Sequence, residues 1–177
     1  MSLQSIHFTD MRKYEITNET HPNNKNLKRI RALKDFSNVK RGELGGFIES
    51  EKNLDQEGNC WLSGNAKVFR NAVVSGDAVV SGNAVVSGDA KVYEDAKVYG
   101  DAVVSWNAVV YGDAEVSGYA KVYGDAVVSD NAQVYGDEKS KPNDNPEILL
   151  SLPEEVTSIT ISGITYTQKV TWVAEEK

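Results

Sequence analysis

Apolar and polar residues alternate in a six-residue cycle from Cys60 to Gly136, and no insertion interrupts the cycle. An alanine begins each copy, a valine follows two positions later, and a turn-forming pair, most often Gly-Asp or Gly-Asn, closes it. Residues 58–63 form a first, imperfect copy with Cys60 in the alanine position. The alanines are residues 66, 72, 78, 84, 90, 96, 102, 108, 114, 120, 126 and 132, and the valines are residues 68, 74, 80, 86, 92, 98, 104, 110, 116, 122, 128 and 134.

This cycle predicts a left-handed parallel β-helix, an all-β fold in which three six-residue units close one triangular coil. The Ala-x-Val triplet is a short strand whose two small side chains face inward. Gly with Asp or Asn makes each corner, because these residues tolerate the positive φ of a tight bend. The repeats give about four to five coils. Stacking at about 4.8 Å per coil makes a short, stiff prism roughly 20 Å long.

Both ends of such a stack need covering, because the outer coils would otherwise expose sheet edges. The flanking segments are the candidates for this role. The predicted division of the chain is a disordered leader at 1–11, an N-terminal cap at 12–53, the β-helix at 54–136, a linker at 137–147 and a C-terminal β-strand cap or appendage at 148–177.

Within the N-terminal cap, alternating residues predict strands at 12–17 and 27–33 that form a hairpin over the first coil. Ile30 and Ala32 are expected to point inward, and the Asn-rich stretch 18–26 is expected to be a loop. The closely spaced Gly42, Gly45 and Gly46 suggest that backbone crosses backbone tightly at the end of the prism.

Residues eighteen positions apart stack in a three-sided prism, so outward side chains sort into three faces. The second face places Tyr93 beside Tyr111 with outward valines around them, which favours an interaction surface. Such residues are also common in any strand, so packing preference alone is the alternative. Other aromatic residues project from corners where Gly or Asp is the rule. The candidate interaction surface consists of Tyr93, Tyr111, Val109, Val127, Trp106 and Tyr119.

One corner stacks Asp77, Asp95 and Asp113 at intervals of about 4.8 Å. The plainest interpretation is that these carboxylates accept backbone N–H bonds in the turns. Two alternatives are a divalent cation held between coils, for which oxygen ligands suit Ca²⁺, and mimicry of a nucleic-acid phosphate backbone.

Several motifs precede the repeats at fixed distances. They are Arg29 to Phe36, Val39 to Gly42, Leu44 to Ile48, Asn53-Leu54 and Gly58 to Trp61. Together they resemble the N-terminal signature of the YdcK-like hexapeptide-repeat proteins of bacteria and of phage or prophage genomes, and the resemblance extends from about residue 12 through Gly136. It implies the β-helix fold and, through the wider superfamily, trimers and the label of transferase.

Acyltransferases of that superfamily use a histidine on the prism as a general base. The two histidines here, His7 and His21, precede the prism, and no coil carries an inserted loop. Two histidines also cannot supply a three-histidine zinc site. We therefore predict no catalytic, cofactor-binding or firm metal-binding residues. The single cysteine, Cys60, is expected to be a buried packing residue.

Charge and hydropathy predict the class of partner and the cellular location. The net charge of −7 divides into about +3 for residues 1–52 and −10 for residues 53–177, so the prism is acidic and a nucleic-acid partner is not expected. No apolar run reaches membrane-spanning length, and we expect a cytoplasmic protein.

The preferred function is a non-catalytic structural or protein-interaction module, associated with phage or prophage, that assembles with copies of itself, first as a trimer, or with another protein. The alternative is an acyltransferase-like or nucleotidyltransferase-like enzyme, which rests on the superfamily resemblance. A minor third hypothesis is an inhibitor that mimics DNA.

Overall fold

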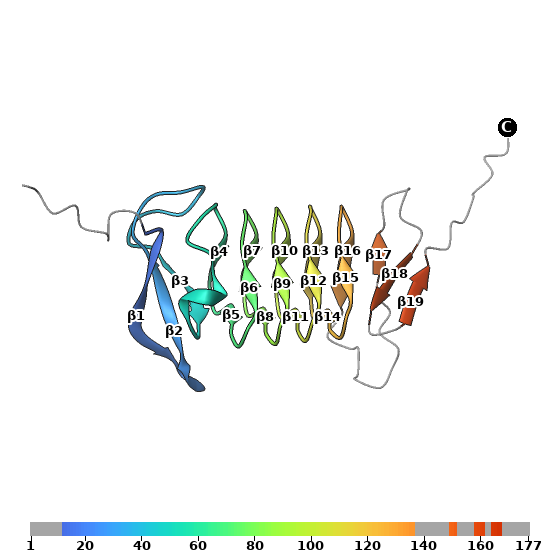
Figure 1. Cartoon of the computed structure of the whole chain (residues 1–177), viewed down its shortest axis with the longest axis horizontal. Helices are drawn as coiled ribbons and strands as arrows, with labels where there is room; N and C mark the ends of the chain where they lie inside the picture. The colour runs from blue at the N-terminus through green and yellow to red at the C-terminus, as the bar shows by residue number, and fades with distance from the viewer. Residues whose placement is uncertain (1–11, 137–148, 152–157, 162–163, 168–177) are drawn as a thin grey trace, which may run out of the picture.

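The protein is a rod of stacked coils with a β-sheet cap at its N-terminal end (Figure 1). The structure is a computed structural model, which describes residues 12–136 in full and, beyond them, the backbone of residues 149–151, 158–161 and 164–167. The predicted leader at 1–11 and linker at 137–147 lie outside the described residues. The predicted all-β solenoid is confirmed, with about five parallel coils.

Three parallel sheets form the sides of the prism. The first face contains β3 (Leu44–Ile48), β5 (Lys67–Val68), β8 (Val85–Val86), β11 (Val103–Val104) and β14 (Lys121–Val122). The second face contains β6 (Val73–Val74), β9 (Lys91–Val92), β12 (Val109–Val110) and β15 (Val127–Val128). The third face contains β4 (Trp61–Leu62), β7 (Val79–Val80), β10 (Lys97–Val98), β13 (Glu115–Gly118) and β16 (Gln133–Gly136).

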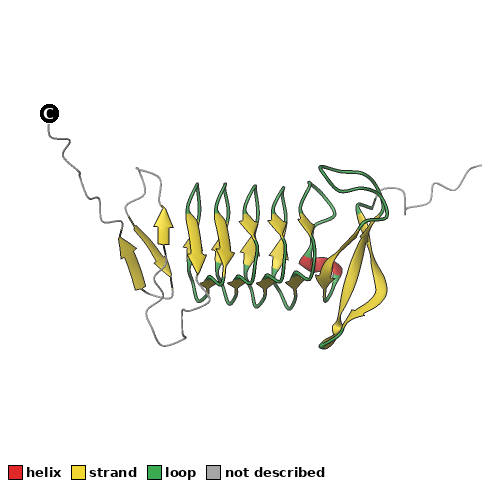
Figure 2. Ribbon diagram, turned by 180° about the vertical axis from the view of Figure 1, so that it is seen from behind, coloured by secondary structure: helices red, strands yellow, loops and turns green. Residues whose placement is uncertain are grey.

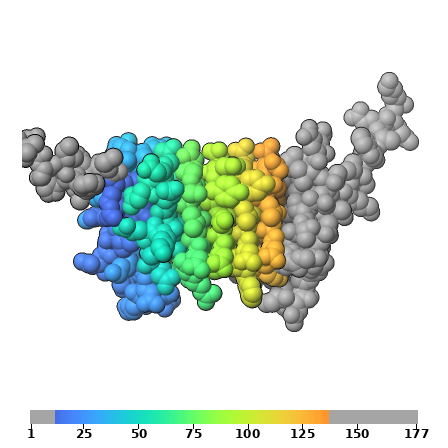
Figure 3. All heavy atoms as spheres, in the orientation of Figure 1, coloured from blue at the N-terminus to red at the C-terminus, as the bar shows by residue number. Residues whose placement is uncertain are grey.

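The core is a column of alternating alanine and valine layers inside the prism. Every repeat alanine and valine is at most 4% exposed, as the six-residue cycle predicts. Each fully buried valine stabilises the fold by about 1.5 kcal/mol or more relative to an exposed one. Space-filling atoms show the coils as contiguous bands with no gap between them (Figure 3).

At the corners, the backbone repeats one hydrogen bond from coil to coil. The amide of Asn83 donates to the carbonyl of Gly100 at 2.8 Å, and the amide of Asp101 donates to that of Gly118 at 2.8 Å. The carbonyl before Asn83 belongs to Gly82 and accepts in the same way from the preceding coil. Consecutive peptide units are therefore aligned head to tail along this corner, and we call such a row a corner column.

Glycine is required in this column for two reasons. Gly82 has a φ of 69°, in the left-handed region that a side chain disfavours. A Cβ atom on Gly82 would also lie 2.9 Å from the carbonyl oxygen of Gly100, which is closer than real contacts allow.

The N-terminal cap is a hairpin of β1 (Tyr14–His21) and β2 (Asn24–Ala32), and β2 continues the sheet to β3. The prediction of a loop over residues 18–26 is wrong, because only Pro22 and Asn23 separate the two strands. Antiparallel pairing offsets the low strand propensity of the asparagines in this stretch. The two strands splay outward as one ribbon beside the coils (Figure 2).

Side-chain directions in β2 agree with the prediction at its end and differ at its start. Ile30 and Ala32 are buried, as expected. Leu27 lies three positions before Ile30 and would point the opposite way in a regular strand, but it is also buried, at 1% exposure. The pairing of β2 is irregular on both sides of Arg29, so the alternation breaks between Leu27 and Ile30.

Gly45 and Gly46 make the tight crossing that their spacing predicts. A Cβ on Gly45 would meet the carbonyl oxygen of Leu62 at 2.7 Å, and one on Gly46 would meet that of Ala66 at 2.6 Å. Gly42 has no atom within 4 Å of its Cβ position and instead supplies a φ of 88° at a turn. Because β3 pairs parallel with β5, the stacking begins one strand before the predicted start at Leu54.

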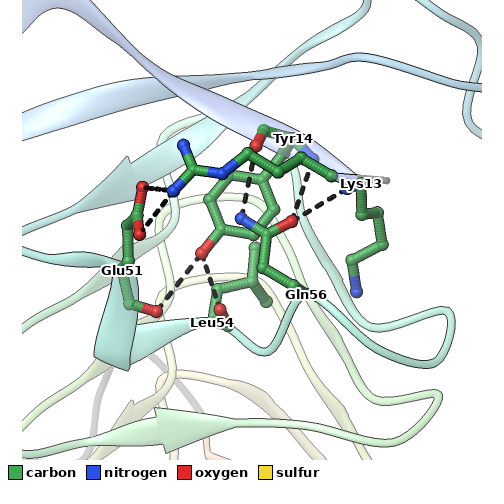
Figure 4. A network of polar contacts seen from close by, with 6 residues as sticks. Lys13, Tyr14, Glu51, Leu54 and Gln56 are labelled. Carbon is green, nitrogen blue, oxygen red and sulfur yellow. Dashed lines mark hydrogen bonds and ion pairs between the residues drawn. The ribbon is translucent and has the colours of Figure 1, made fainter. Parts of the chain in front are cut away.

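Side chains of the cap close the open end of the first coil (Figure 4). The Tyr14 hydroxyl donates to the carbonyl of Leu54 at 2.6 Å, and the Gln56 amide bonds to the backbone of Lys13 and Tyr14. At the end of the 3₁₀ turn η2 (Glu51–Asn53), the Asn53 side-chain amide donates to two carbonyls of the next coil. Side-chain donors thus replace the coil that is missing before the first one.

Short strands follow the repeats, as predicted for the C-terminal segment. They are β17 (Leu149–Ser151), β18 (Ser158–Ile161) and β19 (Ile164–Thr167). β17 pairs antiparallel with β16 and extends the third face, while β18 and β19 form a separate hairpin. In the described part of the chain, no helix has the length and apolar character to cross a bilayer.

Candidate functional site

The outward side chains stack in the predicted registers on all three faces. On the second face Lys91 pairs with Val109, and Val109 pairs with Val127. The rings of Tyr93 and Tyr111 are stacked, with centroids 5.2 Å apart and planes inclined by 5°. The sequence therefore located this aromatic pair correctly.

The third face differs from the second because its outward groups bind one another. Lys97 forms an ion pair with Glu115 at 3.1 Å, and the Tyr99 hydroxyl donates to the same carboxylate at 3.2 Å. The hydrogen bond between Lys97 and Glu115 raises the pKa of Lys97. These polar contacts are typical of a face that water covers.

The second face carries no such network. Its outward positions in β6, β9, β12 and β15 hold three valines and Lys91, and Val127 is 45% exposed. Lys91 has no hydrogen bond or ion pair to any residue that the structure describes. Desolvation raises the pKa of Tyr93, with smaller contributions from Tyr111 and Glu94. The face is consequently the most apolar of the three and the least satisfied by its own contacts.

The corner between the first and second faces holds two large residues in a strained conformation. Arg70 and Trp106 have φ values of 60° and 64°, where the other coils place Gly88 and Gly124. Trp106 is 69% exposed. A left-handed backbone is unusual for a bulky residue and costs about 1–3 kcal/mol.

Between Arg70 and Trp106 the chain forms an open cleft of about 410 Å³, which we call the corner notch. Gly88, in the coil between them, lines this cleft. The residues that line it are Arg70, Asn71, Ser87, Gly88, Asp89, Val103, Ser105, Trp106 and Asn107. The sequence indicated Trp106 as an exception to the corner rule but did not reveal Arg70 as its counterpart, although Arg70 breaks the same rule.

Tyr119, the other corner aromatic, lies at the third corner and is 42% exposed. Its amide donates to the carbonyl of Gly136 at 2.8 Å, so its backbone continues a corner column. That corner joins the third face to the first, whereas Tyr93 and Tyr111 stack on the second face. The six predicted surface residues therefore do not form a single patch.

Carboxylates of the acidic corner accept hydrogen bonds from neighbouring N–H groups. Asp77 accepts hydrogen bonds from the amide and side chain of Asn59, and the Glu94 carboxylate accepts from the amide of Gly112. Among the described residues, no group of three or more His, Cys, Asp or Glu side chains is placed to hold a metal ion, and this includes Asp95 and Asp113. The contacts of Asp77 and Glu94 fit the turn-stabilising interpretation.

A mixed ladder of Asn and Asp at the corner between the first and second faces shows how carboxylates stack there. Asn71 donates to Asp89 at 2.9 Å, and Asn107 donates to Asp125 at 2.8 Å. An amide between successive carboxylates supplies a donor and reduces their repulsion.

The N-terminal end contains a buried polar pair that the sequence did not reveal. The Lys13 ammonium group donates to the carbonyls of Glu57 and Gly58, at 2.9 and 3.3 Å, and lies 3.1 Å from the Cys60 sulfur. Both side chains are fully buried. Burial raises the pKa of Cys60 despite the opposing effect of Lys13. Cys60 occupies the predicted inward position. The Lys13 ammonium group beside it bonds the carbonyls of the first corner, which no preceding coil covers.

His21, the histidine within the described residues, lies on the cap. It packs edge-on against Phe47 at 4.9 Å, and its pKa is lowered by desolvation, Lys67 and Arg29. His7 lies outside the described residues.

Comparison with known proteins agrees with the repeat architecture. The family model for the YdcK β-solenoid repeat matches residues 74–88 and 120–136. A protein of Escherichia coli strain K12, named "Uncharacterized acetyltransferase YdcK", is 39% identical over 61 residues. The match covers 29% of this chain and 19% of that protein, so the chain aligns with about a fifth of its relative.

Proposed function

We propose that this chain, a YdcK-like β-solenoid repeat protein, is a non-catalytic structural module of the cytoplasm that assembles with copies of itself through the second face, first as a trimer. The stacked Tyr93 and Tyr111 rings carry this proposal, together with the outward Val109 and Val127. Removing an apolar face from water favours association, whereas Lys97, Tyr99 and Glu115 on the third face already bond one another.

A copy of the same chain suits the second face chemically. The outward positions of this face hold no carboxylate. A second copy can therefore cover the valines and tyrosines without placing carboxylates at these positions against each other. Lys91 would lie over a tyrosine ring of a neighbouring copy in a cation–π contact. Four strands at about 4.8 Å make a face roughly 20 Å long, which is small for a stable interface. Association should therefore depend on concentration.

Light scattering over a concentration series tests the assembly. The wild-type mass should approach three chains at high concentration. A Tyr93→Ala, Tyr111→Ala double variant should remain a monomer, and a matched Tyr99→Ala, Tyr135→Ala variant on the third face should behave as wild type. A wild-type monomer at every concentration, or equal masses for both double variants, would refute association through the second face.

A second candidate function is acyl transfer, which the printed name of the Escherichia coli relative favours. Acetyl-CoA at millimolar concentration should then bind the chain and be consumed when an acceptor amine or hydroxyl is supplied. Measurable transfer by the purified protein would replace the structural proposal, whereas absence of acetyl-CoA binding would remove the enzymatic one.

A further inference from the structure

The corner notch is built by two departures from the repeat, in alternate coils of one corner. Arg70 and Trp106 replace glycine on either side of Gly88, and two coils separate them by about 10 Å. Gly88 itself could not be enlarged, because a Cβ there would lie 2.7 Å from the backbone nitrogen of Trp106. The bulky residues thus form the two walls and the glycine keeps the space between them open.

Both walls have a strained backbone, and packing gives Trp106 little in return. Its indole is mostly exposed and makes no ring contact with another described side chain. Arg70 is held in place by its backbone, since its amide donates to Glu49 at 2.7 Å and its carbonyl accepts from Asn53 at 2.9 Å. Strain that brings no packing benefit is a reason to look for a ligand.

The side chains of the notch specify the chemistry of such a ligand. An exposed indole offers one flat apolar platform, which a sugar ring can cover with its C–H groups. Asn71, Asp89 and Asn107 offer both donors and acceptors around it, which suits a ligand with many hydroxyl groups. The Arg70 guanidinium lies 5.8 Å from the centroid of the Phe69 ring and has no acidic partner among the described residues, so it can take one carboxylate.

We propose that the corner notch binds an oligosaccharide that contains uronic acid. One ring stacks on Trp106 and the carboxylate of a neighbouring ring pairs with Arg70, since a disaccharide spans about the distance between them. A nucleotide fits less well. No second aromatic residue lines the notch to enclose a base. This inference is independent of self-association, because the notch opens onto the first face through Ser87, Val103 and Ser105.

Titration of the full chain with trigalacturonic acid tests the proposal, with NMR detection of the indole N–H signals. The chain has three tryptophans, and Trp106→Gly identifies which signal belongs to Trp106. That signal should shift with trigalacturonic acid and not with its methyl ester. Trp106→Gly and Arg70→Gln should each weaken binding by about tenfold or more.

The glycine variant also separates a binding role from a structural one. Trp106→Gly restores the corner rule, so it should keep or raise the thermal midpoint while it loses the ligand. Asp130→Gly is the matched control, because Asp130 also has a positive φ, of 56°, at a different corner. It should leave binding within about twofold of wild type.

Three outcomes would overturn the proposal. They are undiminished binding by Trp106→Gly, equal binding of the methyl ester, and a lower thermal midpoint for Trp106→Gly, which would show that the indole serves packing. A shift of the Trp106 signal with adenosine monophosphate but not with the sugar would replace the uronic acid by a nucleotide. Light scattering on Trp106→Gly should give the wild-type mass, so the outcome is separate from that for the second face.

Discussion

Lys13→Met tests whether a buried ammonium group holds the cap on the prism. Lys13 is fully buried and donates to Glu57 and Gly58, whose carbonyls have no preceding coil to bond them. Methionine keeps most of the side-chain volume and removes the donor, so the change isolates the polar contacts from the packing.

The expected magnitude follows from the two carbonyl bonds. The 2.9 Å bond from a charged donor contributes about 1.5–3 kcal/mol, and the longer 3.3 Å bond adds about 1 kcal/mol. Removing the buried charge recovers part of its desolvation cost, so the net loss should be about 3 kcal/mol. A loss of that size raises the population in which the cap is open by about a hundredfold.

Cys60 provides the assay, because it is the single cysteine of the chain and lies beneath Lys13. Under native conditions its labelling by a thiol reagent requires the cap to open, so the rate reports the open population. Lys13→Met should be labelled about a hundred times faster than wild type. Lys121→Met, at an exposed position, is the control and should match wild type. A Lys13→Met rate within about threefold of wild type would refute the capping role.

Three further perturbations probe the prism and its end. Val98→Ala, in a central coil, should lower the free energy of unfolding in urea by about 2 kcal/mol. Val134→Ala, in the last described coil, should lower it by clearly less, because end coils fray. Equal losses for the two variants would contradict the stacked-coil view. Asp130→Gly should raise the free energy of unfolding by about 1 kcal/mol, since it relieves a positive φ, and a loss in the same urea assay would contradict this. Burial, Glu51 and Cys60 raise the pKa of Tyr14 above its unfolded value near 10, so its stabilising effect is complete below about pH 10 and is lost as the pH rises. Urea midpoints between pH 9 and about 11 should therefore fall more steeply for wild type than for Tyr14→Phe, and parallel curves would contradict the assignment.

The repeat region was predictable because each position has one physical task. Alanine and valine alternate inward without a break, so a phase found at Ala66 fixes the direction of every later side chain to Val134. The same phase places Tyr93 on Tyr111, which the structure confirms. Trp106 was recognisable as a departure because the corner rule around it is so regular.

The cap was less predictable because its contacts join residues far apart in sequence. Lys13 meets Cys60 across 47 positions, and no periodic pattern marks a lysine that will be buried. The hairpin loop was placed too broadly because asparagines at 18–26 signal turns wherever they occur, whereas strand pairing decides how many of them remain outside the sheet. The corner notch depends on Arg70 as well as Trp106, and only the stacking of alternate coils brings the two together.

The corner columns give the rod an electrical direction. Each corner peptide points its carbonyl toward the cap and its N–H toward the C-terminal end, so their dipoles add along the axis as they do in an α-helix. The negative end of this sum meets cations: Lys13 at Gly58 and Arg29 at Gly64. In a threefold assembly whose rods lie along the symmetry axis, three such dipoles would add, and their negative ends would gather at the cap, where the net charge of about +3 on residues 1–52 offsets them.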